Sequence, residues 1–429
     1  MIYVIPVFFA LVLESKVSAA TRVVWVDCRA GNDGNNGTRK QPVCSLGRAL
    51  ALASQTNPAG SVTVKIHPGV YTVAPPLKIS RDHLRIEGLS ATVRDSRGFL
   101  EGFDQGVKIM PDGVGAPSAT LPNPLILVHG SDVQFTGLHL LNPRAVTTNY
   151  LKDPGSDYLI AIQFEGQWDM ANPKALTGEA VRLCQFENWL IAVNVNYASA
   201  NIESSRAEKC VVPFWFGPAP GGATINVTHT LMRSNLESSV VATGAPEFWT
   251  IPWQPCSLKL NLSKNRFEDG QLHFGLELYI RDIFPSLNQP GSLKATIRKN
   301  AFARNKLAGI SILDGVHEED RPCDVPYAPV SVHVSLQQNS YTGNGVTAAE
   351  PWEHTALVAF QGFKPNFDPW RANCFINHAA VEIADPANEL ADLRHGTRRF
   401  QYRIRPGGDN RLSVNRYFFT NGIPGAYAP

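Results

Sequence analysis

The densest group of titratable side chains in this sequence lies in one short polar segment, residues 314–323. Carboxyl groups and an imidazole stand within a few positions of one another there, at Asp314, His317, Glu318, Glu319 and Asp320. Groups at this density could supply a general acid and a general base, and Glu319 with Asp320 could hold a hard cation such as Ca²⁺. The alternative is a solvated acidic loop that does no chemistry.

Tryptophans occur in other polar segments of the same kind, at Trp168, Trp249, Trp253 and Trp370. An indole ring presents a flat apolar face and a polar edge, which suits contact with sugar rings. The alternative is that these rings anchor their own loops on the body of the protein. The two roles are compatible, so Trp249, Trp253 and Trp370 are candidate substrate-binding residues.

Two chemistries would cleave a polysaccharide. Elimination beside a uronate needs a base at the carbon next to the carboxylate and a cation that neutralises this carboxylate. Five basic residues are candidates for that cation: Lys264, Arg266, Arg281, Arg298 and Lys299. The alternative is that they are exposed without a function, because basic residues are common where a chain turns from one strand to the next. Hydrolysis needs two carboxylates about 5 to 9 Å apart, and Asp282 and Asp314 are the candidate pair, with Glu277 nearby.

A repeat unit over residues 294–313 must position these groups. Ile297, Asn300 and Phe302 predict a short strand that turns a corner at the asparagine and is followed by another strand. The same frame recurs around Asn265, Asn339 and Asn415. Recurring short strands indicate a solenoid, because one coil cannot bury its apolar edge until neighbouring coils stack on it.

The strands fall into two predicted columns. The first runs through residues 181–183, 202, 225–227, 258–262, 295–297 and 330–336, and the second through residues 192–195, 214–216, 239–242, 272–280, 309–313 and 356–360. The corner asparagines are 35 residues apart from Asn265 to Asn300 and 39 from Asn300 to Asn339. These spacings are longer than the roughly 20 to 30 residues that a short repeat needs. The additional residues must form an insertion in each coil, and these insertions follow the second column.

Insertions in a solenoid share one face, which is often the binding face. We therefore expect one groove to be bordered by Arg281, Asp282, Asp314, His317, Glu318 and Trp370. Acids that converge in a cleft point to a functional site, because burial of an unpaired carboxylate costs several kcal/mol.

The composition limits the possible classes of protein. A chain of 429 residues with 44% hydrophobic residues permits one long solenoid or several small domains, and the repeats favour the solenoid. A net charge of +2 argues against a general nucleic-acid binder, although a local basic patch is compatible with it. We expect one domain over residues 21–429, with an irregular C-terminal cap from about residue 374, in a monomeric protein.

The first twenty residues have the features of a signal peptide. An apolar run, Ile2–Leu13, is followed by the small residues of Val-Ser-Ala-Ala, although no Lys or Arg precedes the run. The alternative is a membrane anchor, but the run is shorter than the roughly 20 residues that span a bilayer, as is every later apolar segment. We predict a signal peptide over residues 1–20 and a secreted, extracellular protein without a transmembrane segment.

Seven cysteines fit an oxidising compartment. Cys28 and Cys44 flank a Gly- and Asn-rich loop and are the predicted disulfide pair. Cys184 and Cys210 lie 26 residues apart, about one coil, so they either face each other on adjacent coils or are two buried core thiols.

The start of the predicted domain carries a more specific pattern. It reads VWVDCRAGNDGNNGT from Val24, then QPVCSLGRALALA from Gln41, then VTVKIHPGVY from Val62. This series resembles the N-terminal cap and first coils of secreted right-handed parallel β-helix proteins, the pectin-lyase-like superfamily. The resemblance implies an all-β, right-handed parallel β-helix whose open end is closed by a capping helix. It is close over about the first seventy residues after the leader and looser beyond them.

The resemblance also bears on catalysis. The sequence has neither the Asn-Thr-Asp and Asp-Asp pairing of polygalacturonases nor the Gly-Arg-Pro-Trp segment of pectin methylesterases. Its Leu393-Arg-His-Gly is similar to a segment of alginate lyases and chondroitinase B in which the arginine is catalytic. Arg394 is therefore a candidate, although it follows the regular coils.

These patterns predict a carbohydrate-active protein that acts on an extracellular polysaccharide, with a lyase favoured over a hydrolase and with Lys299 and the tryptophans in contact with the polymer. The alternative is a non-catalytic β-helix for adhesion, carbohydrate binding or surface structure, which would need no converging acids. The fold does not choose between them, since function resides in the site.

Overall fold

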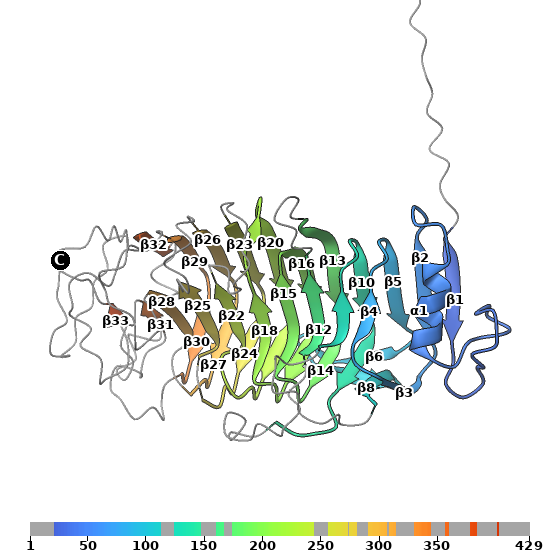
Figure 1. Cartoon of the computed structure of the whole chain (residues 1–429). Coiled ribbons are helices and arrows are strands. Elements are labelled where there is room, and N and C mark those ends of the chain that lie inside the picture. Colours follow the sequence, from blue (N-terminus) through green and yellow to red (C-terminus); the bar gives the residue numbers. More distant parts are fainter. Residues whose placement is uncertain are drawn as a thin grey trace, which may run out of the picture.

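The structure is a computed structural model of the whole chain. It describes residues 21–112, 124–146, 160–166, 174–243, 256–272, 274–280, 291–306, 309–314, 330–344, 357–359, 378–383 and 401–402. Over these residues the chain winds through three long parallel sheets, and each coil from β2 to β31 adds one strand to each sheet (Figure 1). Crossovers between parallel strands are right-handed. The predicted fold class, a right-handed parallel β-helix, is confirmed.

We number the sheets in the order in which the chain enters them within a coil. Sheet 1 contains β1 (Arg22–Val26), β2 (Val62–Ile66), β5 (Leu84–Gly88), β10 (Val133–Thr136), β13 (Leu176–Arg182), β16 (Ala198–Glu203), β20 (Ala223–Thr228), β23 (Cys256–Ser263), β26 (Gly291–Arg298), β29 (Val330–Gln337) and β32 (His378–Ile383), with β19 (Ala219–Pro220) antiparallel to β23. β32 continues sheet 1 past residue 374, where the sequence predicts the cap to begin.

Sheet 2 consists of shorter strands. They are β3 (Gly69–Val73), β8 (Val107–Pro111), β11 (Leu138–Leu141), β14 (Gln185–Glu187), β17 (Arg206–Glu208), β21 (Leu231–Arg233), β24 (Arg266–Glu268), β27 (Ala301–Ala303) and β30 (Ser340–Thr342). A separate hairpin of β6 (Ala91–Arg94) and β7 (Leu100–Asp104) leaves the coil between β5 and β8.

Sheet 3 completes each coil. Its strands are β4 (Leu77–Ile79), β9 (Pro124–Val128), β12 (Ile160–Glu165), β15 (Ile191–Asn196), β18 (Val212–Phe216), β22 (Val240–Thr243), β25 (Leu276–Ile280), β28 (Ile310–Asp314), β31 (Leu357–Ala359) and β33 (Gln401–Tyr402). The two predicted columns correspond to sheets 1 and 3. The two-column prediction was incomplete, because sheet 2 lies between them with strands of only three residues in most coils.

The core is built from inward rows of apolar side chains at matching positions of successive strands. One row of sheet 1 runs through Phe135, Val181, Ile202, Val227, Leu262, Ile297 and Leu336, each fully buried. Alternate residues of a strand point to opposite faces, so the residues between these positions form the outer face of the solenoid.

The N-terminal end is closed as predicted. Helix α1 (Leu46–Ser54) packs against β1 and β2 and buries Leu46, Ala49 and Leu50. Ser45 caps the helix, because its Oγ accepts a hydrogen bond from the Arg48 N–H at 3.1 Å. Asp33, in the Gly- and Asn-rich loop, accepts from the Ser45 N–H and Oγ at 2.9 and 2.7 Å and ties the loop to the helix.

The corner from sheet 1 to sheet 2 is held by a ladder of buried polar side chains. At the corners that follow β13 to β29, one residue with left-handed backbone, such as Lys264 or Lys299, precedes the ladder residue. The N–H of Asn265 donates to Asn300 Oδ1 at 2.9 Å, and the N–H of Asn300 donates to Asn339 Oδ1 at 3.0 Å. The predicted asparagine corners are therefore confirmed at these positions, while Asn415 lies outside the described residues.

Candidate functional site

The outer face of sheet 3 carries the candidate site. Its strands point Val193, Phe214 and Val240 into the core, and the alternating row faces outward. This outer row runs through Asn194, Trp215, Val241 and Glu277 on four successive strands. Neighbouring strands are about 4.8 Å apart, so side chains from consecutive coils stand side by side along the solenoid axis.

Two glutamates come together at this row. Glu277 lies on β25, and Glu237 lies in the turn that leads from β21 to β22. Ser238, next to Glu237, donates a hydrogen bond from its Oγ to Glu277 Oε2 at 2.7 Å. Both glutamate side chains are only partly exposed. The turn and the strand therefore place two carboxyl groups in one electrostatic environment.

Burial is the main cause of an elevated pKa for both groups. It raises the pKa of Glu277 to about 7, against the lowering effect of the Ser238 hydrogen bond, and the negative charge of Glu237 raises it further. Burial also raises the pKa of Glu237 above the ordinary range of a glutamate. Glu277 therefore holds a proton near neutral pH, which suits a general acid.

Two polar atoms along the same row lack hydrogen-bond partners in the described part of the chain. They are Oδ1 of Asn194 and Nε1 of Trp215, on adjacent strands β15 and β18. Asn194 is 6% exposed. A buried polar atom without a partner costs free energy, so hydrogen bonding in this part of the row is incomplete.

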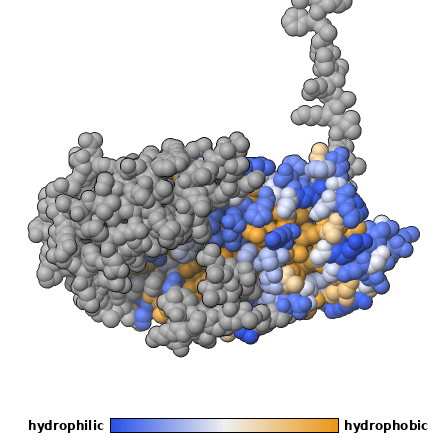
Figure 2. Space-filling view, in the orientation of Figure 1, coloured by the Kyte–Doolittle hydropathy of each residue, from blue (hydrophilic) through white to orange (hydrophobic). Residues whose placement is uncertain are grey.

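An apolar cluster outside the main core borders the carboxyl pair. It consists of Val211, Val212, Leu236 and Val241, with Val146, Leu190 and Trp215 packed against it. In the orientation of Figure 1, Figure 2 shows apolar surface bordered by hydrophilic residues over the coils toward the N-terminal end of the solenoid. An acidic pair beside an apolar floor with an indole is a common composition of a ligand site.

Most of the predicted site residues lie outside the described residues. These are Asp282, His317, Glu318, Arg281 and Arg394 among the catalytic candidates, Trp249, Trp253 and Trp370 among the substrate-binding candidates, and Glu319 and Asp320 as metal candidates. Asp314 is the last residue of β28. The insertions that contain most of these residues follow β22, β25, β28 and β31, which are consecutive strands of sheet 3. The groove that the sequence predicts along these insertions stays a prediction.

Of the five predicted cations, Arg281 lies outside the described residues, and the other four divide into two groups. Lys264, Arg298 and Lys299 are exposed on sheet 1 and its corner, away from the outer row of sheet 3. Arg266 is paired with Glu268 and with Asp95, the latter at 3.1 Å. Arg266 is therefore bound within the protein, and the outer row of β12 to β28 contains neither Lys nor Arg.

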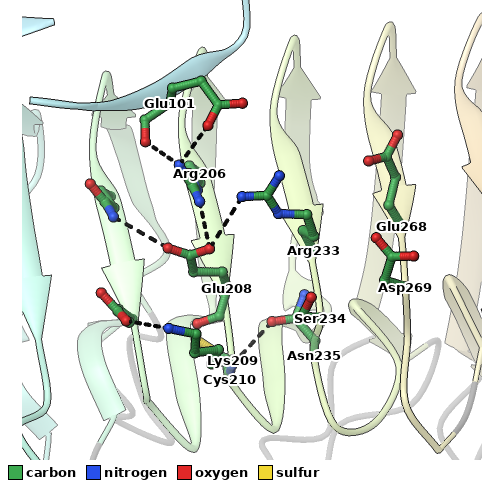
Figure 3. A network of polar contacts seen from close by, with 12 residues as sticks. Glu101, Arg206, Glu208, Lys209, Cys210, Arg233, Ser234, Asn235, Glu268 and Asp269 are labelled. Atoms are coloured by element: carbon green, nitrogen blue, oxygen red, sulfur yellow. Dashed lines mark hydrogen bonds and ion pairs between the residues drawn. The ribbon is translucent and has the colours of Figure 1, made fainter. Parts of the chain in front are cut away.

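A second polar cluster lies on sheet 2 and is structural. Arg206 pairs with Glu208 Oε2 at 2.6 Å and with Glu101 Oε2 of the β6–β7 hairpin at 3.2 Å (Figure 3). Arg233 stands 3.6 Å from the same Glu208 carboxylate on the neighbouring coil. Because these charges neutralise one another and hold the hairpin on the sheet, we do not assign catalysis to this cluster.

The predicted disulfide is not formed in the structure. Cys28 and Cys44 are separate thiols, with Cys44 Sγ 3.7 Å from the Cys28 carbonyl oxygen. Cys184 and Cys210 are separate, fully buried thiols. Of the two alternatives for this pair, the buried core thiols are therefore correct. Burial raises the pKa of both to about 12, which leaves them unreactive.

Within the described ranges, no group of three His, Cys, Asp or Glu side chains is placed to hold a metal ion. The only helix in those ranges, α1, is too short to cross a membrane.

The sequence did not identify Glu237, Asn194 or Trp215 as site residues. Glu237 lies in an ordinary polar turn, and its partner on β25 is 40 positions away, so no local spacing connects the two. Trp215 has the one usable signal, because it stands between inward Phe214 and Phe216 and alternation places it outside.

Comparison with known proteins adds little to this geometry. No known protein family and no curated protein matches the sequence. Among solved structures, the chain is similar to the Dettilon tailspike protein, with 12% identity over 88% of this chain and 70% of that one and a TM-score of 0.39. It is also similar to GH136 lacto-N-biosidase from Eubacterium ramulus, with 9% identity over 75% and 67% and a TM-score of 0.34. A pectate lyase matches with 12% identity over 76% and 78% and a TM-score of 0.27.

Proposed function

We propose that this protein is a secreted glycoside hydrolase that cleaves an extracellular polysaccharide on the outer face of sheet 3. The observation that carries the proposal is the pair of Glu237 and Glu277, in which one carboxyl group stays protonated near neutral pH beside a second one. Glycosidic hydrolysis uses such a pair, because one carboxyl protonates the leaving oxygen while the other acts on the opposite side of the sugar.

The roles follow from the pKa values. Glu277 has the pKa of about 7 and donates the proton to the glycosidic oxygen. Glu237 is the second carboxylate, which attacks the anomeric carbon or activates the water that does so. Asn194 and Trp215 lie in the same row, one to three coils from the pair, and would line the path of the polymer.

Hydrolysis fits this row better than the elimination favoured by the sequence. Elimination needs a cation next to the uronate carboxylate, and the strands from β12 to β28 supply none on this face. Two acidic groups would also repel a uronate once they ionise. A neutral region of a polysaccharide is therefore the better substrate for this site.

The test is an activity assay on a panel of neutral and uronate polymers that follows new reducing ends and the ultraviolet absorbance of an unsaturated uronate. We expect reducing ends without the ultraviolet signal. Glu277→Gln should lower the rate about a hundredfold or more, because the amide has no proton of suitable acidity to donate. The matched control is Glu203→Gln, an exposed glutamate on sheet 1 whose rate should equal that of the wild type.

Other outcomes would change the assignment. Both signals together would mean elimination, and full activity of the Glu277→Gln variant would remove the pair from the mechanism. Absence of any product across the panel would favour the non-catalytic alternative, a β-helix that binds carbohydrate or serves in adhesion.

A further inference from the structure

The outer face of sheet 1 carries a second concentration of charge, of the opposite sign. Five exposed cations stand on β23, β26 and the corner residues that follow these strands: Lys259, Lys264, Lys294, Arg298 and Lys299. We call them the cation face. The net charge of the whole chain is only +2, so this is a local separation of charge rather than a property of the composition.

The cations are aligned along the solenoid axis. Lys259 is in register with Lys294 on the next strand, and the corner residues Lys264 and Lys299 occupy equivalent positions of the same two coils. Because neighbouring strands are about 4.8 Å apart, the face presents two short rows of positive charge with one cation per coil in each row.

These like charges have no counter-charges in the structure as described. None of the five cations forms an ion pair with another described residue. The four strands of this region, β20, β23, β26 and β29, contain no Asp or Glu in their sequences. Aligned cations without neighbouring anions repel one another, so a bound external anion would reduce this electrostatic repulsion.

Neutral polar side chains fill the space between the cation rows. Asn201, Asn226 and Asn261 form an outer row in which each Nδ2 donates to the preceding Oδ1, at 2.7 Å and 2.8 Å. Thr296 continues this row between Lys294 and Arg298. The face is thus flat and rich in amide and hydroxyl groups, which suit a ligand that carries hydroxyl groups as well as charge.

The composition of the face discriminates between classes of polyanion. Single-stranded nucleic acids are bound through aromatic rings on which bases stack, and β20, β23 and β26 contain no aromatic residue. Anionic membranes are bound through cations combined with inserted apolar side chains, and the exposed large apolar residues in the described ranges, such as Val70 and Val93, lie elsewhere. An anionic polysaccharide needs neither, since its charges and hydroxyl groups match the two kinds of row.

We propose that the cation face binds an anionic polysaccharide chain laid along the solenoid axis, with its acidic groups on Lys259, Lys294 and Arg298 and its hydroxyl groups on the asparagine row. This site is separate from the carboxyl pair on sheet 3 and does not rest on the hydrolase proposal. It would hold the protein on an acidic polymer whether or not the other face is catalytic.

The test compares two full-length triple variants that lose the same charge. The first is Lys259→Gln, Lys294→Gln and Arg298→Gln, and the control changes the exposed lysines Lys40, Lys174 and Lys306 to Gln. Binding to polygalacturonate, alginate and neutral dextran is measured by calorimetry at low salt. We expect binding to at least one acidic polymer, about tenfold weaker in the first variant and unchanged in the control, because each exposed ion contact contributes modestly.

Further arms separate the alternatives. Added salt should weaken the binding, since it screens exposed charges, and both variants should keep the wild-type melting temperature. Equal loss in the control would show that net charge, and not this face, is responsible, and would overturn the proposal. The proposal would also be overturned if no acidic polymer binds. It would likewise be overturned if a single-stranded oligonucleotide or phosphatidylserine vesicles bind through the same three residues more tightly than the acidic polymers do.

Discussion

Glu179 occupies a position that the fold otherwise fills with hydrocarbon. On β13 it is in register with Ala200, which continues through Ile225 and Leu260 in an inward row of sheet 1. The side chain is fully buried, and neither carboxylate oxygen has a hydrogen-bond partner in the described part of the chain. Burial raises its pKa to about 8 against the lowering effect of the nearby backbone N–H groups of Glu179 and Asp132, and the Asp132 charge adds a smaller rise, so the residue is protonated at neutral pH.

This pKa predicts a loss of stability as pH rises. The ordinary pKa of 4.5 applies to the unfolded chain, so between about pH 4.5 and 8 the unfolded state ionises while the folded state keeps its proton. Unfolding then releases a proton, and the free energy of unfolding falls with rising pH over this interval. Glu179→Gln should remove this part of the pH dependence. Urea denaturation from pH 5 to pH 8 measures it, with the exposed Glu203→Gln as the control that should keep the wild-type slope.

The surroundings of Glu277 allow a test in which two substitutions should shift its pKa in opposite directions. The charge of Glu237 raises the pKa of Glu277, so Glu237→Gln should lower it. The Ser238 hydrogen bond stabilises the ionised form of Glu277, so Ser238→Ala should raise its pKa. Carbon-13 NMR of the glutamate side-chain carboxyls follows both shifts directly. If both variants moved the pKa in the same direction, the described contacts would not control the Glu277 proton.

At the scale of the elements, the corners hold the coils in register. Asn300 accepts from the Asn265 N–H at 2.9 Å and donates from Nδ2 to the Leu262 carbonyl oxygen at 3.0 Å. It is 2% exposed, so water cannot replace these partners. A side chain thus supplies the hydrogen bonds that the backbone lacks where it changes from one sheet to the next.

Removal of this side chain should therefore be costly. Asn300→Ala leaves a buried N–H and a buried carbonyl without partners, and we expect the free energy of unfolding to fall by about 2 to 4 kcal/mol. Thr296→Ala, on the outer face of the same coil, is the matched control and should change it by less than about 0.5 kcal/mol. Chemical denaturation of the three proteins measures the difference, and equal stability of both variants would contradict the role of the ladder.

The sequence predicted the elements whose patterns are long and missed those that are short. Strands such as β23 and β26 are long enough to show alternation, and the asparagine at their corner marked each coil. β27 has three residues, too few for a period to be seen, so sheet 2 was missed as a separate layer. A signal was available, because Asn305 and Asn344 follow Asn300 and Asn339 at the same interval and form a second ladder, with the Asn305 N–H donating to Asn344 Oδ1 at 3.1 Å.

The candidate site was predicted less well than the fold, for a physical reason. A solenoid repeats its backbone, so local patterns determine it, whereas a site combines side chains from distant coils. Glu277 was noted only as a neighbour of Asp282, because its raised pKa depends on burial and on Glu237, neither of which a local pattern shows. Lys299 lies at the corner after β26, rather than beside the acids, and this position likewise follows from the path of the coil and not from distance in the sequence.

At the scale of the whole molecule, the solenoid keeps two kinds of chemistry apart. Each coil passes through all three sheets, so neighbouring coils contribute to the cation face on sheet 1 and to the carboxyl pair on sheet 3 at the same time. The two faces belong to different sides of the coil (Figure 1). Mutations at two sites that share no partners have additive free-energy effects, so the independence of the two faces can be measured.

The last prediction is that the two faces act independently. The cation-face triple variant should bind acidic polysaccharide about tenfold more weakly while kcat on a neutral polymer stays at the wild-type value. Glu277→Gln should lower kcat about a hundredfold or more and leave the affinity for the acidic polymer unchanged. The combined variant should show both effects, each of the same size as in the single variant. Calorimetry and reducing-end assays on the four proteins complete the cycle. A change of acidic-polymer affinity in Glu277→Gln would mean that one polymer chain spans both faces, and the two sites would then have to be described as one.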